Sequence, residues 1–137
     1  MKKMTILLLF LFFCIRATAP EFRTLVILRA DEIKPYEKLW KAVCQVESSG
    51  NPFAYNEGED AVGISQIREI RIRDYNKLTG KNYKLSEMFD PVKSKKVFMY
   101  YAGKFSSHDI ERIARSWNGS GPLTEIYWKK VKKQIKN

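Results

Sequence analysis

The stretch QVESSGNPFAYN (residues 45–56) places a single glutamate, Glu47, at the carboxyl end of an amphipathic helix. Pro35 suits the first helical position. After it, apolar residues recur at steps of three and four: Tyr36, Leu39, Trp40, Val43 and Val46. Ser48, Ser49, Gly50 and Pro52 then end the helix. The pattern predicts three to four helical turns, with Glu47 on the same face as Val43 and Trp40.

This position favours the protonated form of Glu47. Partial burial disfavours a carboxylate, and the unpaired carbonyl groups at the helix end repel negative charge, so both effects raise the pKa. A proton donor that works near neutral pH needs such a raised pKa. The spacing alone leaves one alternative open, a surface glutamate at a fraying helix end.

The middle of the chain is predicted to hold little regular structure before the next helical pattern. A loop rich in Asn, Gly and acids leads to the short apolar element AVGISQI (residues 61–67), with at most a small β-hairpin near residues 53–64. In the basic stretch that follows, Ile70, Ile72 and Tyr75 are expected to face inward, and Gly80 marks its end.

Three further helices are expected in the second half. Asp90 as N-cap and Pro91 at the first position begin one, with a buried stripe of Phe98, Tyr101, Ala102 and Phe105. The next is expected to be capped by Ser106 or Ser107 and ended by Gly119, with these residues inward: Ile110, Ile113, Ala114 and Trp117. The last helix aligns Tyr127 or Trp128 with Val131 and Ile135, and lysines cover its other face. These elements predict a single, mostly α domain.

The first residues have the pattern of a secretory signal. MKK is followed by the apolar run ILLLFLFFCI and by the small residues ATA, and this run is too short to span a membrane. We therefore expect a signal peptide over 1–19, a leader over 20–34 and the functional domain over 35–137. Pro20 would hinder cleavage, so a short uncleaved anchor is the alternative. Export to the periplasm or cell envelope follows, and only Cys44 would remain, which excludes an internal disulfide.

The chain is strongly basic, with 25 Lys and Arg against 15 Asp and Glu. That balance favours an anionic partner such as a cell-wall polymer, a membrane surface or a nucleic acid. No phosphate-binding loop or base-stacking motif supports a nucleic acid. The lysine face of the last helix is more consistent with attraction to an anionic envelope. One histidine and no ligand-spaced cluster predict neither a metal nor a cofactor.

Several segments, taken in order, resemble the lytic transglycosylase family, which has a lysozyme-like fold related to goose-type lysozyme. ESSGNPFAYN (47–56) resembles that family's Glu-Ser motif with Asn-Pro-x-Ala, and AVGISQI (61–67) its Gly-Leu-Met-Gln motif. RSWNGSGP (115–122) resembles Ala-Tyr-Asn-x-Gly, and TEIYWKKV (124–131) resembles the final Thr-x-x-Tyr-x-x-Lys-Val helix. The resemblance covers roughly residues 36–132, and several motifs in order are far more specific than one.

The resemblance implies a lysozyme-like (α+β) domain that cleaves peptidoglycan between N-acetylmuramic acid and N-acetylglucosamine. Glu47 would be the catalytic acid and then the base, and the muramic acid would close a 1,6-anhydro ring. Ser48, Gly63, Gln66 and Asn118 match family positions at the substrate. Trp117 stands where the family has a tyrosine, so the hydroxyl's task would pass to Tyr101, Tyr100 or Tyr127. Tyr127, matched by the final motif, is the preferred cleft aromatic, and Ser65 replaces a family methionine.

Other functions stay open at this point. Glu59 or Asp60 could supply a second carboxylate and turn the enzyme into a hydrolytic muramidase, because hydrolases of glycans ordinarily use two. Solvated turn acids are the simpler interpretation of both residues. A non-catalytic cationic wall-binding module and a cationic membrane-disrupting protein are alternatives of other classes. A monomer is expected.

Overall fold

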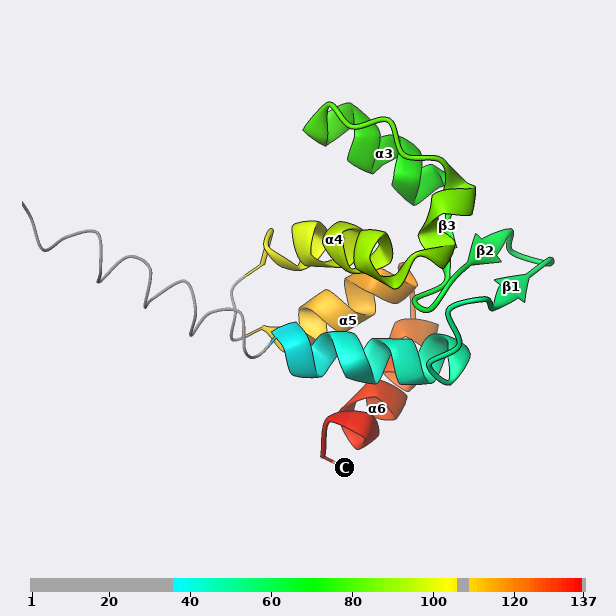
Figure 1. Ribbon diagram of the computed structural model, residues 1–137. Helices are drawn as coiled ribbons and strands as arrows, with labels where there is room; N and C mark the ends of the chain where they lie inside the picture. Colours follow the sequence, from blue (N-terminus) through cyan, green and yellow to red (C-terminus); the bar gives the residue numbers. More distant parts are fainter. Residues whose placement is uncertain (1–35, 106–108, 137) are drawn as a thin grey trace, which may run out of the picture. The chain divides into compact units, whose positions relative to one another are not determined.

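The computed structural model describes residues 36–105 and 109–136. They form a mostly helical fold with a small three-stranded antiparallel sheet, as expected (Figure 1). The predicted signal peptide (1–19) and leader (20–34) lie outside the described residues, as do Ser106, Ser107 and His108. No helix within the described ranges is long and apolar enough to cross a membrane.

The first described helix spans residues 36–48, as its apolar spacing predicts. Leu39, Trp40 and Val43 are buried in the core. The ring of Trp40 lies 5.2 Å from that of Phe98, which is fully buried, and Phe98 in turn lies 5.0 Å from Trp117. Three segments that are far apart in the sequence therefore meet around one aromatic side chain.

The sheet follows that helix. Strands β1 (Tyr55–Asn56), β2 (Ala61–Val62) and β3 (Ile67–Arg68) lie in the order β1-β2-β3, with Tyr55 opposite Val62 and Ala61 opposite Arg68. The hairpin of β1 and β2 agrees with the predicted one. The third strand exceeds the prediction, because two residues are too few to show an alternating pattern.

Helix α3 (Glu69–Thr79) buries Ile72 and Tyr75, as predicted, and ends at Gly80 in the left-handed region. The inward placement of Ile70 is wrong, since its side chain is 57% exposed. Residues two apart point to different sides of a helix, so Ile70 cannot share the face of Ile72, whereas Tyr75, three residues further, does.

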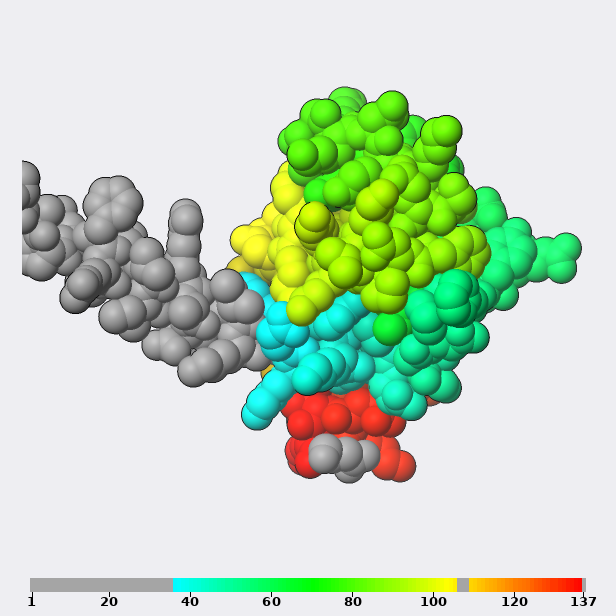
Figure 2. Space-filling model, in the orientation of Figure 1, coloured from blue at the N-terminus to red at the C-terminus, as the bar shows by residue number. Residues whose placement is uncertain are grey.

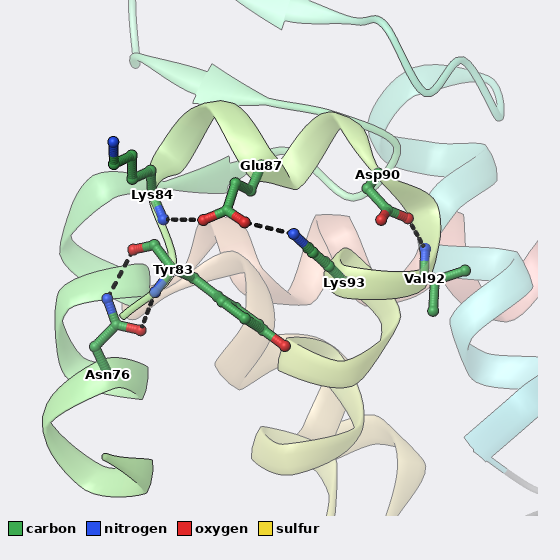
Figure 3. A network of polar contacts seen from close by, with 7 residues as sticks. All are labelled: Asn76, Tyr83, Lys84, Glu87, Asp90, Val92 and Lys93. Carbon is green, nitrogen blue, oxygen red and sulfur yellow. Dashed lines mark hydrogen bonds and ion pairs between the residues drawn. The ribbon is translucent and has the colours of Figure 1, made fainter. Parts of the chain in front are cut away.

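A polar network joins α3 to the 3-10 helix η1 (Leu85–Phe89) and to helix α4 (Pro91–Ala102) (Figure 3). The side chain of Asn76 accepts from the backbone N–H of Tyr83 and donates to its carbonyl oxygen, at 2.9 and 2.7 Å. Glu87 accepts from the N–H of Lys84 at 2.7 Å and forms an ion pair with Lys93. These bonds hold the segment between α3 and α4 in place.

Helix α4 (Pro91–Ala102) begins as predicted, because Asp90 accepts a hydrogen bond from the N–H of Val92 at 2.8 Å. Phe98 and Ala102 are buried, Tyr101 is partly exposed, and Phe105 lies beyond the helix end. In the space-filling view, α3, α4 and helix 36–48 lie side by side on one face (Figure 2).

Helix α5 (Ile110–Asn118) is capped by Asp109, which accepts from the N–H of Arg112 at 3.1 Å, so the prediction of Ser106 or Ser107 is wrong. Ser and Asp are equally good caps, and the stretch SSHD offers three of them within four residues. Gly119 ends the helix as expected. Helix α6 (Leu123–Lys136) then packs along α5 and buries Tyr127, Trp128 and Val131.

Candidate active site

Glu47 lies in the last turn of helix 36–48 with its side chain half-buried. The two residues that follow the helix, Ser49 and Gly50, adopt left-handed conformations with φ of 55° and 78°. Their N–H groups bond to the carbonyl oxygens of Gln45 and Cys44, both at 3.1 Å. The chain therefore turns away soon after Glu47, and the Glu47 side chain lines a pocket.

Tyr127 of α6 donates a hydrogen bond to Oε1 of Glu47 at 2.8 Å, across 80 residues of sequence. The pKa of Glu47 is raised from 4.5 to about 7, chiefly by burial and to a smaller extent by the charge of Glu59. The Tyr127 hydroxyl and the nearby Arg68 and Arg71 act in the opposite direction. Burial is the larger effect, so a large fraction of Glu47 carries a proton near neutral pH.

The pocket around Glu47 has a volume of about 130 Å³ and an almost entirely polar lining. Helix 36–48 contributes Glu47, the sheet and its loops contribute four residues, and the rest come from α3 and the end of α5. Those other residues are Asn56, Glu59, Gln66, Arg68, Arg71, Trp117 and Asn118. Of the residues predicted at the site, Glu47, Gln66, Trp117 and Asn118 are therefore brought together.

Ser48 and Gly63 do not line this pocket but contact the turn that carries Gln66. The Ser48 hydroxyl donates to the carbonyl oxygen of Ile64 at 2.8 Å and lies 3.2 Å from that of Cys44. Gly63 has φ of +78°, and a Cβ built there would lie 2.1 Å from the carbonyl oxygen of Met88 in η1. Both residues fix the turn between β2 and β3 against its neighbours.

Gln66 projects from that turn with its own backbone in the left-handed region, at φ of 51°. Its side-chain amide donates to the carbonyl oxygen of Gly63 at 3.0 Å, while the backbone N–H of Gly63 donates to Ala54 at 2.8 Å. These bonds hold the Gln66 side chain at the pocket wall.

Trp117 is nearly buried, yet it reaches the pocket. Its Nε1 donates to the carbonyl oxygen of Ser65 at 3.2 Å, which ties α5 to the turn between β2 and β3. The hydroxyl of Ser65 is buried and has no hydrogen-bond partner among residues 36–105 and 109–136. Tyr101 is set back from the pocket, with its hydroxyl donating to the carbonyl oxygen of Arg71 at 3.2 Å.

The two acids considered as a second carboxylate differ in position. Glu59 lines the pocket and lies 3.8 Å from Arg68. Asp60 accepts a hydrogen bond from the hydroxyl of Tyr55 at 3.2 Å and does not line the pocket. Glu59 is therefore the acid that shares the site with Glu47.

Arg68 and Arg71 are pocket residues that the sequence reasoning missed. The available signal was the basic stretch REIRIRD directly after Gln66, where the two arginines stand three residues apart at the start of a helix. No group of three or more metal-ligating side chains occurs in residues 36–105 and 109–136. A wider hollow of about 840 Å³ beside α5 is lined by Arg112, Arg115 and Thr124 among others, and Glu47 is not part of it.

Comparison with known proteins gives two findings. Residues 26–118 match the family model described as the transglycosylase SLT domain. The chain is 29% identical over 134 residues to "Membrane-bound lytic murein transglycosylase E" of Buchnera aphidicola subsp. Acyrthosiphon pisum (strain APS), an alignment that covers 88% of this chain. The chain spans 60% of the length of that curated relative. No solved structure matches it.

Proposed function

Because the chain belongs to the transglycosylase SLT domain family, we propose that it is a peptidoglycan lytic transglycosylase with Glu47 as its general acid and base. The observation that carries this proposal is the half-buried carboxyl group of Glu47, hydrogen-bonded to Tyr127 at the head of a polar pocket. The name of the relative from Buchnera, a lytic murein transglycosylase, supports the same substrate class.

In the proposed reaction, protonated Glu47 gives its proton to the oxygen between N-acetylmuramic acid and N-acetylglucosamine. The bond from C1 of the muramic acid to that oxygen breaks, and the 6-hydroxyl of the same sugar forms a new bond to C1. The Glu47 carboxylate takes the hydroxyl proton, so a 1,6-anhydro ring closes and no water is consumed. A pKa of about 7 suits a group that must first give and then accept a proton.

The other pocket residues have supporting roles in this proposal. The Tyr127 hydroxyl holds the Glu47 carboxyl group in one orientation and stabilises the carboxylate once the proton has left. Gln66 and Asn118 offer amide groups to the sugar, and Trp117 offers an aromatic edge. Ser48 and Gly63 act by fixing the turn that carries Gln66, and Tyr101 acts through Arg71.

Hydrolysis is the second candidate function, because Glu59 lines the same pocket as Glu47. A carboxylate there could activate a water molecule for attack on C1.

The long lysine face of α6, which includes the exposed residues Lys129, Lys132 and Lys133, would hold either enzyme near an anionic cell envelope. The signal-like N-terminal stretch supports export to that compartment.

Digestion of purified peptidoglycan sacculi tests the proposal, with the released fragments identified by mass spectrometry. We expect anhydromuropeptides from the wild-type chain and at least a hundredfold less product from Glu47→Gln. Glu57→Gln, at an exposed glutamate of the neighbouring loop, is the matched control and should keep full activity.

Fragments heavier by one water would instead identify a muramidase, and their loss in Glu59→Gln would assign the second carboxylate. If Glu47→Gln releases anhydro products as fast as the wild type, the assignment of Glu47 is wrong. If the wild type binds sacculi without cutting them, the chain is a wall-binding module.

A further inference from the structure

Arg68 and Arg71 line two neighbouring hollows. One is the Glu47 pocket, and the other is a hollow of about 170 Å³ that is completed by Ile70, Asp74 and Tyr101. Because both arginines belong to both hollows, they lie at the boundary between them. A sugar bound beside Glu47 would thus have room for a substituent in the second hollow, with two cations along the way.

Arg71 is held rigidly at this boundary. Its guanidinium lies 4.4 Å from the ring centre of Trp117 and 4.9 Å from that of Tyr101. It also donates a hydrogen bond to the carbonyl oxygen of Trp117 at 3.0 Å. Burial lowers the pKa of Arg71, but an arginine keeps its positive charge under all physiological conditions. The side chain is therefore a fixed cation whose orientation needs no further ordering on ligand binding.

This cation has no carboxylate partner at ion-pair distance among the described residues. Arg68 has a loose contact of 3.8 Å with Glu59, whose side chain is largely exposed. Glu47, with a pKa of about 7, is only partly ionised near neutral pH and so provides only part of a compensating charge. Asp74 lines the second hollow with both arginines, but among the described residues it forms no ion pair with either. The Arg71 guanidinium is therefore open to a carboxylate ligand.

We propose that Arg68 and Arg71 form an anion subsite that takes a carboxylate carried by the muramic acid residue. This inference rests on the proposed function, since muramic acid is the sugar of the glycan strand with a carboxyl-bearing substituent. That carboxylate is either the free lactyl group or a carboxyl group of the stem peptide attached to it. The planar fork of a guanidinium pairs with both oxygens of a carboxylate, which a single ammonium does not match.

Binding measurements on the full chain in a Glu47→Gln background test the subsite without turnover. Isothermal titration calorimetry would compare three ligands of equal glycan length. These are a muramyl fragment with a free lactyl carboxyl, the same fragment with its stem peptide, and a neutral oligomer of N-acetylglucosamine. We expect at least one muramyl fragment to bind about tenfold more tightly than the neutral oligomer. The fragment that shows this preference identifies which carboxyl group is bound.

Variants then assign the preference to the arginines. Arg71→Gln and Arg68→Gln should each weaken the binding of the muramyl fragment by about tenfold. The affinity for the neutral oligomer should change by less than about twofold. Asp74→Asn removes a negative charge from the second hollow and should strengthen muramyl binding. Arg73→Gln, an exposed arginine on the same helix, is the matched control and should change neither ligand.

Three results would overturn the subsite. Arg71→Gln could weaken the binding of muramyl and neutral ligands equally, while Arg68→Gln changes neither affinity. Arg71 would then only stabilise the packing of α5 and would not bind a carboxylate. Equal binding of all three ligands before substitution would remove the subsite and leave the proposed function standing. Failure to bind any glycan would contradict the proposed function and the subsite together. Thermal unfolding of each variant separates lost binding from lost folding.

Discussion

Glu47 occupies a position that a sequence selected only for stability would not give to an acid. Its carboxyl group is half-buried at a helix carboxyl end, and burial raises its pKa to about 7. Tyr127 moderates this shift, because its hydroxyl donates to the carboxylate and so favours the charged form. The pKa of Glu47 is thus a balance between burial and one long-range hydrogen bond.

That balance predicts the effect of Tyr127→Phe. The hydrogen bond from Tyr127 is the largest effect that lowers the pKa of Glu47. Without the hydroxyl, this pKa should therefore rise above about 7. Activity requires protonated Glu47, so the high-pH limb of the kcat/KM profile should move to higher pH. We also expect kcat to fall about tenfold, because the carboxyl group loses its fixed orientation. Tyr83→Phe, in the network of Figure 3, is the control. If the high-pH limb of Tyr127→Phe coincides with that of the wild type, this account is wrong.

Ser65 gives a second prediction for a single residue. Its buried hydroxyl has no hydrogen-bond partner in the described part of the chain, which costs free energy relative to an apolar group. Ser65→Ala should therefore leave the free energy of unfolding unchanged or raise it by up to about 1 kcal/mol. Ser94→Ala is an informative contrast, since the equally buried hydroxyl of Ser94 donates to the carbonyl oxygen of Met88 at 2.7 Å. Urea unfolding should show a loss of stability for Ser94→Ala and none for Ser65→Ala.

Among the elements, the turn between β2 and β3 organises the pocket. It carries Gln66, accepts hydrogen bonds from Ser48 and Trp117, and lies directly against η1 through Gly63. The close approach at Gly63 leaves no room for a side chain. A change there should shift the whole turn and with it the pocket wall.

Gly63→Ala tests this arrangement of elements. The new Cβ would overlap the carbonyl oxygen of Met88, and φ of +78° adds strain, so a loss of about 3 kcal/mol or more in unfolding free energy is expected. Gly80→Ala is the matched control. Gly80 has a similar φ of +68° with nothing within 4 Å, so only about 1 kcal/mol should be lost. Equal losses in the two variants would show that the contact with η1 is not tight.

The same elements show what could be predicted from the sequence. Asp90 with Pro91 and the spacing of Leu39, Trp40 and Val43 are local signals, and the helices they predict are present. The cap of α5 was misplaced, because several good caps stand next to each other. Arg68 and Arg71 were missed because their place in the pocket depends on how β3 and the start of α3 lie against the end of α5, which no local pattern records.

For the whole molecule, the raised pKa of Glu47 makes stability depend on pH. An unfolded glutamate has a pKa near 4.5 and the folded one about 7, so the folded state binds more protons between these values. Stability should therefore fall as pH rises from about 4.5 to 7, by up to about 3 kcal/mol. Glu47→Gln lacks this term and should be increasingly more stable than the wild type towards about pH 8.

Urea unfolding at about pH 4 and about pH 8 checks the sign. Glu57→Gln provides the comparison, since its side chain is exposed in the loop and outside the pocket. If the stability advantage of Glu47→Gln over the wild type, measured as the free energy of unfolding, decreases as the pH rises, the raised pKa is contradicted.

The hydrogen bond between Tyr127 and Glu47 also has a consequence for the order of folding. It joins residues 80 positions apart, and contacts of such separation form late because a long loop must first be closed. Helix content can recover before α6 packs against the rest of the fold. The Glu47 carboxyl group, however, is held in place only once α6 has packed and Tyr127 can donate its hydrogen bond. During refolding, the recovery of cutting activity should therefore lag behind the recovery of helix content, and a chain that ends before α6 would be helical and silent.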